Sequence, residues 1–160
     1  DASEALEALA AGGDGADAAA AAVCEAAWHL SFHRIGSRAV QLALERASPV
    51  HLARALAGLR GNIPTSARSA HASAVLETAI HVSGREAAEC VATELLGHGR
   101  ATTVNPGGSC VVRALLEHAS GEPCVVRLTD EILAGDLAAL CCHKSGHRVA
   151  EAVLSNGLAR

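Results

Sequence analysis

Cysteine and histidine side chains gather near the end of the chain, where they could ligate a metal ion. Thiolate and imidazole groups are common ligands of zinc, and this stretch contains Cys141, Cys142, His143 and His147. Gly146 separates the two histidines, and glycine disfavours the unbroken helix that would place them one turn apart on one face. Without that geometry no tetrahedral ligand set forms, so we predict no metal site and no cofactor.

Catalytic chemistry needs a nucleophile or acid beside a base, and the sequence offers no such arrangement. Asp130 and Glu131 are neighbours in a helical pattern, where a solvated pair is a simpler interpretation than a catalytic dyad. The pair Gly107 and Gly108 is not a phosphate-binding loop, because no strand pattern precedes it and no lysine follows it. We therefore predict that the protein is not an enzyme.

The cysteines indicate a reducing compartment, either an organelle or the cytoplasm. None of them forms a Cys-x-x-Cys pair, and most fall inside expected helices, at positions 24, 90, 110, 124, 141 and 142. We interpret them as small buried apolar residues rather than disulfides. No run reaches the ~18 apolar residues of a membrane span. The chain begins at Asp1 rather than Met, which favours a processed or trimmed form of a longer protein.

Composition limits how the chain can build a core and which partners suit it. Half of its 160 residues are hydrophobic, but it has one Phe, one Trp and no Tyr or Met. The core must therefore be made of Ala, Val and Leu on closely packed helices. The net charge of −4 does not suggest a surface that coats nucleic acid.

The elements that carry these residues repeat about every 36 residues. A helical pattern at 36–45 returns at 72–80, 108–116 and 146–154, with a weaker copy at 2–9. We call these five segments the motif helices. Each unit also shows a short leading helix and a second long helix, and no alternating strand pattern appears. The period predicts one all-α repeat domain over 1–160, whose shared core contains Val40, Leu44, Leu76, Ile80, Val112, Leu116 and Leu154.

A three-helix unit of this length, whose middle helix opens Gly-Ser-Arg-x-Val-Gln, resembles the Pumilio (PUF) repeat. The best matches are HRIGSRAVQ at 33–41 and HKSGHRVAE at 143–151. The resemblance spans essentially the whole chain in register, as four units and a degenerate fifth, whereas a full array has eight. It implies a right-handed α-solenoid.

The resemblance also implies site residues. In that family each unit reads one RNA base: two side chains one helical turn apart meet the base edge, and the residue after the first stacks between bases. Carried over, the edge readers are Ser37 with Gln41, Ser73 with Glu77, Ser109 with Arg113, and His147 with Glu151. The stacking positions hold Arg38, Ala74, Cys110 and Arg148. The family's code links Ser with Gln to adenine, Ser with Glu to guanine and Ser with Arg to cytosine, and has no clear assignment for His with Glu.

Helix capping is an alternative explanation for part of this pattern. Each serine of the edge pairs lies at a predicted helix start, where serine is a preferred N-cap, and we favour that role for the serines. Ala74 and Cys110 cannot stack on a base as an aromatic ring or a guanidinium group does. Arg38 and Arg148 are not explained as caps, so they carry the argument for RNA.

Two functions fit a non-catalytic helical-repeat module. The first is a protein-binding accessory subunit of a larger assembly, such as an imported subunit of an organellar complex; we favour it because the chain is acidic and two stacking residues are missing. The alternative is binding of single-stranded RNA on the concave face, which needs positive charge and stacking. A basic groove that aligns Arg38, Arg113 and Arg148 would favour RNA.

Overall fold

The computed structural model describes residues 1–157, and within that range every regular element is a helix. The motif helices are α1 (Ala2–Ala11), α4 (Arg34–Arg46), α7 (Ala72–Ser83), α10 (Pro106–Ala119) and α13 (Gly146–Gly157). The second long helices are α2 (Asp14–Glu25), α5 (Pro49–Leu59), α8 (Arg85–Leu95) and α11 (Pro123–Leu133). Short helices precede the later motif helices: α3 (Ala27–Ser31), α6 (Ile63–Arg68), α9 (Gly99–Thr103) and α12 (Leu137–Cys142).

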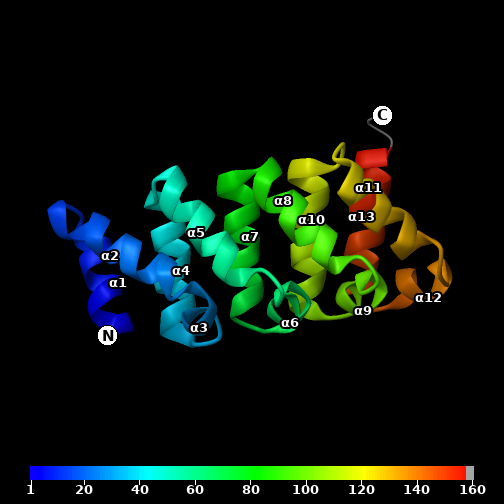
Figure 1. Ribbon diagram of the computed structural model, residues 1–160. Helices are drawn as coiled ribbons and strands as arrows, with labels where there is room; N and C mark the ends of the chain where they lie inside the picture. The colour runs from blue at the N-terminus through cyan, green and yellow to red at the C-terminus, as the bar shows by residue number, and fades with distance from the viewer. Residues whose placement is uncertain (158–160) are drawn as a thin grey trace.

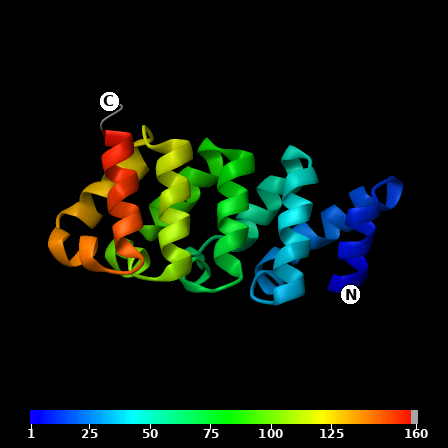
Figure 2. The ribbon, with the colours of Figure 1, turned by 180° about the vertical axis from the view of Figure 1, so that it is seen from behind.

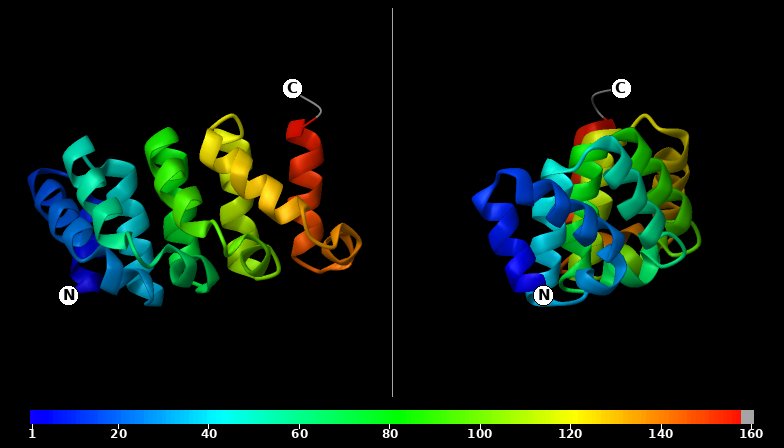
Figure 3. Two further views of the ribbon diagram at one scale, coloured as in Figure 1. Left: turned by 45° about the vertical axis from the view of Figure 1, so that its right-hand side comes forward. Right: turned by 60° about the vertical axis from the view of Figure 1, so that its left-hand side comes forward.

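The helices stack in two main layers along an elongated molecule. Each motif helix packs against the next one, and Figure 2 shows the five side by side from α1 to α13. The second helices α5, α8 and α11 form the layer that faces the viewer in Figure 1, and the termini lie at opposite ends. Both views in Figure 3 show the same two-layered stack. The predicted right-handed α-solenoid is confirmed. No described helix is both long and apolar enough to cross a membrane.

The serines of the repeated pairs are not N-caps, so the capping interpretation is wrong. Ser37, Ser73 and Ser109 lie inside their helices and are 3%, 4% and 2% exposed. Ser37 Oγ donates to the Arg34 carbonyl at 3.2 Å, and Ser109 Oγ donates to the Pro106 carbonyl at 2.8 Å. The N-cap positions of these helices are held by His33, His71 and Asn105, of which Asn105 caps with its side chain.

Asn105 shows how a motif helix begins. Its Oδ1 accepts from the amides of Gly107 and Gly108, at 3.0 and 3.1 Å, and Pro106 occupies the first helical position. Both features satisfy or remove backbone donors that a helix start leaves unpaired. These contacts set the start of α10 at Pro106, three residues before Ser109.

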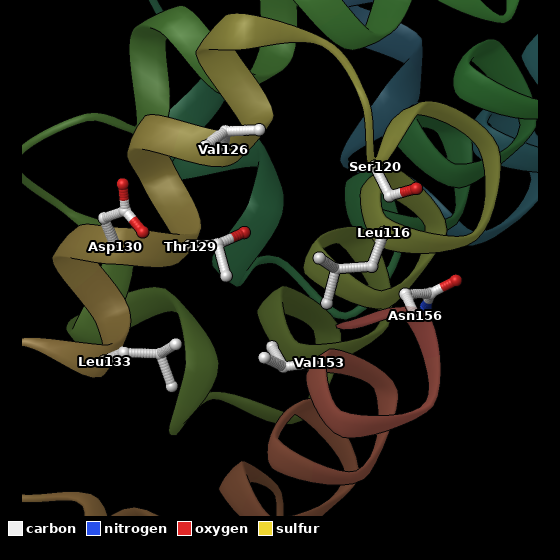
Figure 4. A pocket seen from close by; sticks show the side chains of 8 residues that line it. All are labelled: Leu116, Ser120, Val126, Thr129, Asp130, Leu133, Val153 and Asn156. Carbon is white, nitrogen blue, oxygen red and sulfur yellow. The ribbon is translucent and has the colours of Figure 1, made fainter. Parts of the chain in front are cut away.

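The predicted core forms, with one exception. Val40, Leu44, Leu76, Ile80, Val112 and Leu116 are all buried. Leu154 is 65% exposed, whereas Leu116, at the same register position of the preceding motif helix, is 4% exposed. The prediction for Leu154 is wrong because α13 is the last described motif helix: α10 packs against it, and the only other helix with substantial contact in the described range is the short α12. A groove between α10, α11 and α13 is lined by apolar side chains such as Leu116 and Val153 and by polar ones such as Thr129 and Asn156 (Figure 4).

Two glutamates of the second layer tie neighbouring units together. Glu94 in α8 accepts from the amides of Gly61 at 2.8 Å and Ile63 at 3.3 Å. One unit later, Glu131 in α11 accepts from Gly97 at 2.7 Å and Gly99 at 2.9 Å. Gly61 and Gly97 have φ of 78° and 82°, which glycine adopts without strain. Glu131 is therefore not the solvated partner of Asp130 that its sequence context suggested.

The cysteines are less buried than expected. Cys24 alone among them is buried, which raises its thiol pKa to about 11, while Cys141 and Cys142 are exposed. The two exposed thiols lie at the end of the short helix α12, in which Leu140 is the buried residue.

Candidate nucleic-acid interface

The face formed by α4, α7, α10 and α13, which we call the motif face, carries all the predicted site residues. In each of these helices the first and second members of the edge pair are one turn apart, so they share a side of the helix. Because the helices are stacked in register, the pairs recur at equivalent places along the molecule. The serines are buried at the base of this face, while the fourth residue after each stays half-buried or exposed.

The second unit presents a groove with several polar groups. Ser37, Arg38 and Gln41 line it together with His71 and Ala74 of the next unit. Gln41 Nε2 donates to the Ser37 carbonyl at 3.1 Å, which holds the amide against its own helix. The exposed Arg38 guanidinium is free to cover a planar ligand lying in the groove. This unit has the amide and the planar cation that base recognition uses.

The third unit has a carboxyl group in place of the amide. Glu77 is half-buried, and this burial raises the pKa of its carboxyl above the usual value of 4.5. The positive charge of Arg113 lowers the pKa and the negative charge of Glu117 raises it, both from α10. Gly107 faces Ser73, and a Cβ at that glycine would lie 2.7 Å from Ser73 Oγ. Glycine at 107 therefore keeps the space beside the Ser73 hydroxyl open.

The fourth unit places a guanidinium group among carboxylates. Arg113 Nη2 lies 3.3 Å from Glu117 Oε1, one turn further along α10. Both side chains line a groove with Arg148 and Glu151 of α13. A second groove joins Ser109 to Arg148. The structure thus brings Arg113 and Arg148 together, while Arg38 lies in a separate groove of the second unit.

The two histidines of the fifth unit contact the backbone at the start of α13 through their Nδ1 atoms. His143 precedes α13, and its Nδ1 accepts from the amides of Ser145 at 3.1 Å and Gly146 at 3.3 Å. His147 Nδ1 lies 3.1 Å from the His143 carbonyl oxygen. Both rings are therefore engaged with the backbone at the start of α13, and Glu151 remains exposed on the motif face.

Sequence reasoning missed two basic residues of this face. Arg34 lines the groove of the second unit and Lys144 lines the groove that joins Ser109 to Arg148. Both are exposed and stand two residues before the first glycine of a motif, Gly36 or Gly146. That shared register position could have identified them. The motif face is thus basic in its second and fifth units and mixed in charge between them.

Comparison with protein families matches three segments of the chain, just over half of it, to the Pumilio-family RNA binding repeat. The matched residues are 28–57, 103–133 and 136–157. The unit of Ser73 and Glu77, with alanine at its stacking position, lies outside the matched segments. A comparison with curated protein sequences found no match.

Three solved structures are similar in fold. The Puf3 RNA binding domain bound to a Cox17 RNA 3′ UTR site is 18% identical with a TM-score of 0.84, over 98% of this chain and 44% of that one. PUF-8 in complex with PBE-RNA is 20% identical with a TM-score of 0.84, over 97% and 46%. The Puf4 RNA binding domain bound to an HO endonuclease RNA sequence is 16% identical with a TM-score of 0.82, over 97% and 48%. The chain spans about half the length of these structures.

These matches overturn the function that the sequence was taken to favour. A protein-binding accessory subunit was preferred because the chain is acidic and lacks two stacking residues. The family match is to a repeat that binds RNA, so the main expectation is wrong and its alternative is better supported. Net charge was misleading because it does not say where charges lie: Arg34, Arg38, Lys144 and Arg148 line grooves of the motif face, although Glu117 and Glu151 line one as well.

Proposed function

We propose, since the chain belongs to the Pumilio family of RNA-binding repeats, that it binds single-stranded RNA on the motif face and has no catalytic activity. The observation that carries the proposal is the recurrence of one polar pair per unit at equivalent places on adjacent helices. Such spacing suits a ligand whose recognisable groups also repeat, and the bases of an extended RNA strand do so.

The order of the pairs implies a short preferred sequence. In the family's antiparallel arrangement, Ser109 with Arg113 would face cytosine, the pair of Glu77 would face guanine, and the pair of Gln41 would face adenine. The central units would therefore favour 5′-CGA-3′. Arg38 would stack on the adenine, and Arg148 would stack at the far side of the cytosine.

Affinity should be modest and sensitive to salt. Base stacking contributes roughly 1–3 kcal/mol per base, and Ala74 and Cys110 cannot supply it. The remaining contacts rely on arginine and lysine, so binding should weaken steeply as salt displaces the RNA. Protein subunits as partners, which were expected from the acidic charge and the missing stacking residues, stay an untested prediction.

A fluorescence-anisotropy titration at low salt tests the proposal. A single-stranded RNA with a central 5′-CGA-3′ should bind more tightly than a scrambled RNA of the same composition. The scrambled strand controls for charge, since both strands carry the same phosphates. Equal binding of the two strands would reject base reading by these units, and no binding of either would reject RNA as the ligand.

A further inference from the structure

Charged side chains of the adjacent helices α7 and α10 influence one another in the middle of the motif face. Arg113 and Glu117 of α10 form an ion pair at 3.3 Å. Glu77 of α7 feels the charges of both residues, although Arg113 makes no ion pair with it within the described range. Glu77 and Arg113, the second edge readers of two neighbouring units, therefore carry opposite charges. The distance between the two charged groups depends on where the long arginine side chain is held.

The residue one turn after the second edge reader differs from unit to unit. The same register position holds Glu45 in α4, His81 in α7, Glu117 in α10 and Ser155 in α13. Glu45 follows the neutral Gln41 and forms no ion pair within the described residues. Glu117 alone among these four residues is paired to the edge reader of its own helix. It also lines the groove that Arg113 shares with Arg148 and Glu151.

Without Glu117, the arginine would have two nearby carboxylates left: Glu151 of α13, which lines the same groove and is exposed, and Glu77 of α7. Of the two, Glu77 is half-buried, so its attraction for a cation is screened less than that of the exposed Glu151. A bond between Glu77 and Arg113 would occupy the two groups that guanine and cytosine need. Recognition of guanine or of cytosine would then first require the bond between Glu77 and Arg113 to break.

We propose that Glu117 is a specificity-determining residue of the fourth unit, which holds Arg113 on α10 and keeps it from pairing with the edge reader of the third unit. The proposal rests on the proposed function, since Glu77 and Arg113 matter as base readers. Glu117 acts through Arg113 as a positioning residue. Because Glu117 holds Arg113 in this way, the third and fourth units read their bases independently in the wild-type protein.

Binding of four RNAs tests this independence. The strands combine G or A opposite Glu77 with C or U opposite Arg113. In the wild type the two base changes should reduce affinity by factors that multiply. In Glu117→Gln the preference for C over U should fall by about twofold, the size expected for an exposed ion pair one helical turn apart. The losses of affinity caused by the two base changes should then no longer multiply.

Glu45→Gln is the matched control, because it removes the same charge from the same register position. Both variants should show a similar rise in general affinity for RNA, but Glu45→Gln should leave the C-over-U ratio unchanged. If the two variants have the same ratio, Glu117 contributes only charge and the proposal is wrong. Equal melting temperatures of the variants would exclude a folding defect as the cause.

A measurement without RNA separates this inference from the proposed function. Carbon-detected NMR titration gives the pKa of Glu77 in the wild type and in Glu117→Gln. Removing a like charge lowers this pKa in any case, so the same comparison is made in an Arg113→Met background. The drop should be larger when Arg113 is present, because the arginine then moves towards Glu77. Equal drops in both backgrounds would overturn the proposal even if RNA binds.

Discussion

At the scale of single residues, each edge pair combines a buried serine with a more exposed partner that differs between units. The serine hydroxyls of Ser37 and Ser109 are tied to backbone carbonyls of their own helices. The partners Gln41, Glu77 and Arg113 differ in charge and hydrogen-bonding pattern. Differences in base preference between units should therefore arise at these partner positions.

Exchanging one partner should exchange one base preference. We expect Gln41→Glu to move the preference of the second unit from adenine towards guanine, because a carboxylate only accepts hydrogen bonds whereas an amide also donates them. Anisotropy titrations with 5′-CGA-3′ and 5′-CGG-3′ strands measure the shift. An unchanged ratio of the two affinities would show that Gln41 does not contact a base.

The stacking position should affect all sequences alike. We expect Arg38→Ala to weaken RNA binding by roughly 1–3 kcal/mol whatever the base, because stacking does not depend on base identity. The test compares dissociation constants for matched and scrambled RNAs. A loss confined to strands with adenine opposite Gln41 would instead make Arg38 an edge reader.

The burial of Glu77 predicts a pH dependence of guanine recognition. Its raised pKa means that the protonated carboxyl is favoured here more than in water, and the protonated form loses acceptor capacity for guanine. Guanine preference should therefore be full at neutral pH and begin to fall at a higher pH than the usual 4.5 of a glutamate. Titrations from neutral to mildly acidic pH with G and A strands measure this, and Glu77→Gln should abolish the dependence.

At the scale of helices, the second layer fixes how one unit sits on the next. The carboxylate of Glu131 holds the loop at Gly97 and Gly99, directly before α9 and the motif helix α10. The position of the motif helix α10 therefore depends on a side chain that lies in the other layer.

Loss of this contact should destabilise the protein. Hydrogen bonds to a charged group contribute about 1.5–3 kcal/mol, so we expect Glu131→Ala to lower the free energy of unfolding by about 2 kcal/mol. Asp130→Ala, at an exposed neighbour of the same helix, should change it by less than about 0.5 kcal/mol. Urea denaturation measures the free energy of unfolding of both variants. Similar losses in the two would contradict a specific role for the Glu131 contact.

At the scale of the whole molecule, neighbouring motif helices cover one another along the stack, and α13 is the last of those described. The exposed Leu154 lies on α13, whereas the groove in Figure 4 lies between α10, α11 and α13. Buried and exposed leucines at one register position show that burial here is set by the next helix along the stack.

The two leucines should respond differently to the same substitution. Leu116→Ala should cost about 2–5 kcal/mol, as expected for a buried leucine in a well-packed site, while Leu154→Ala should cost less than about 0.5 kcal/mol. Chemical denaturation of the two variants measures both. A large loss for Leu154→Ala would show that this end of the stack is covered in solution.

The sequence by itself determined the helices, their period and the family. Residues such as Val40 and Leu44, or Leu76 and Ile80, recur at helical spacing, and a period near 36 makes equivalent residues meet when units stack. These are local patterns, which is why they could be read directly.

Only the tertiary structure decided what each residue faces. Leu154 carries the same local pattern as Leu116 but is exposed, and Glu131 reaches a loop some thirty residues earlier in the chain. The role of Glu117 likewise depends on Glu77 across the helix boundary. Local spacing fixes the side of a helix on which a residue lies, whereas burial, charge pairing and loop contacts depend on the helix packed opposite.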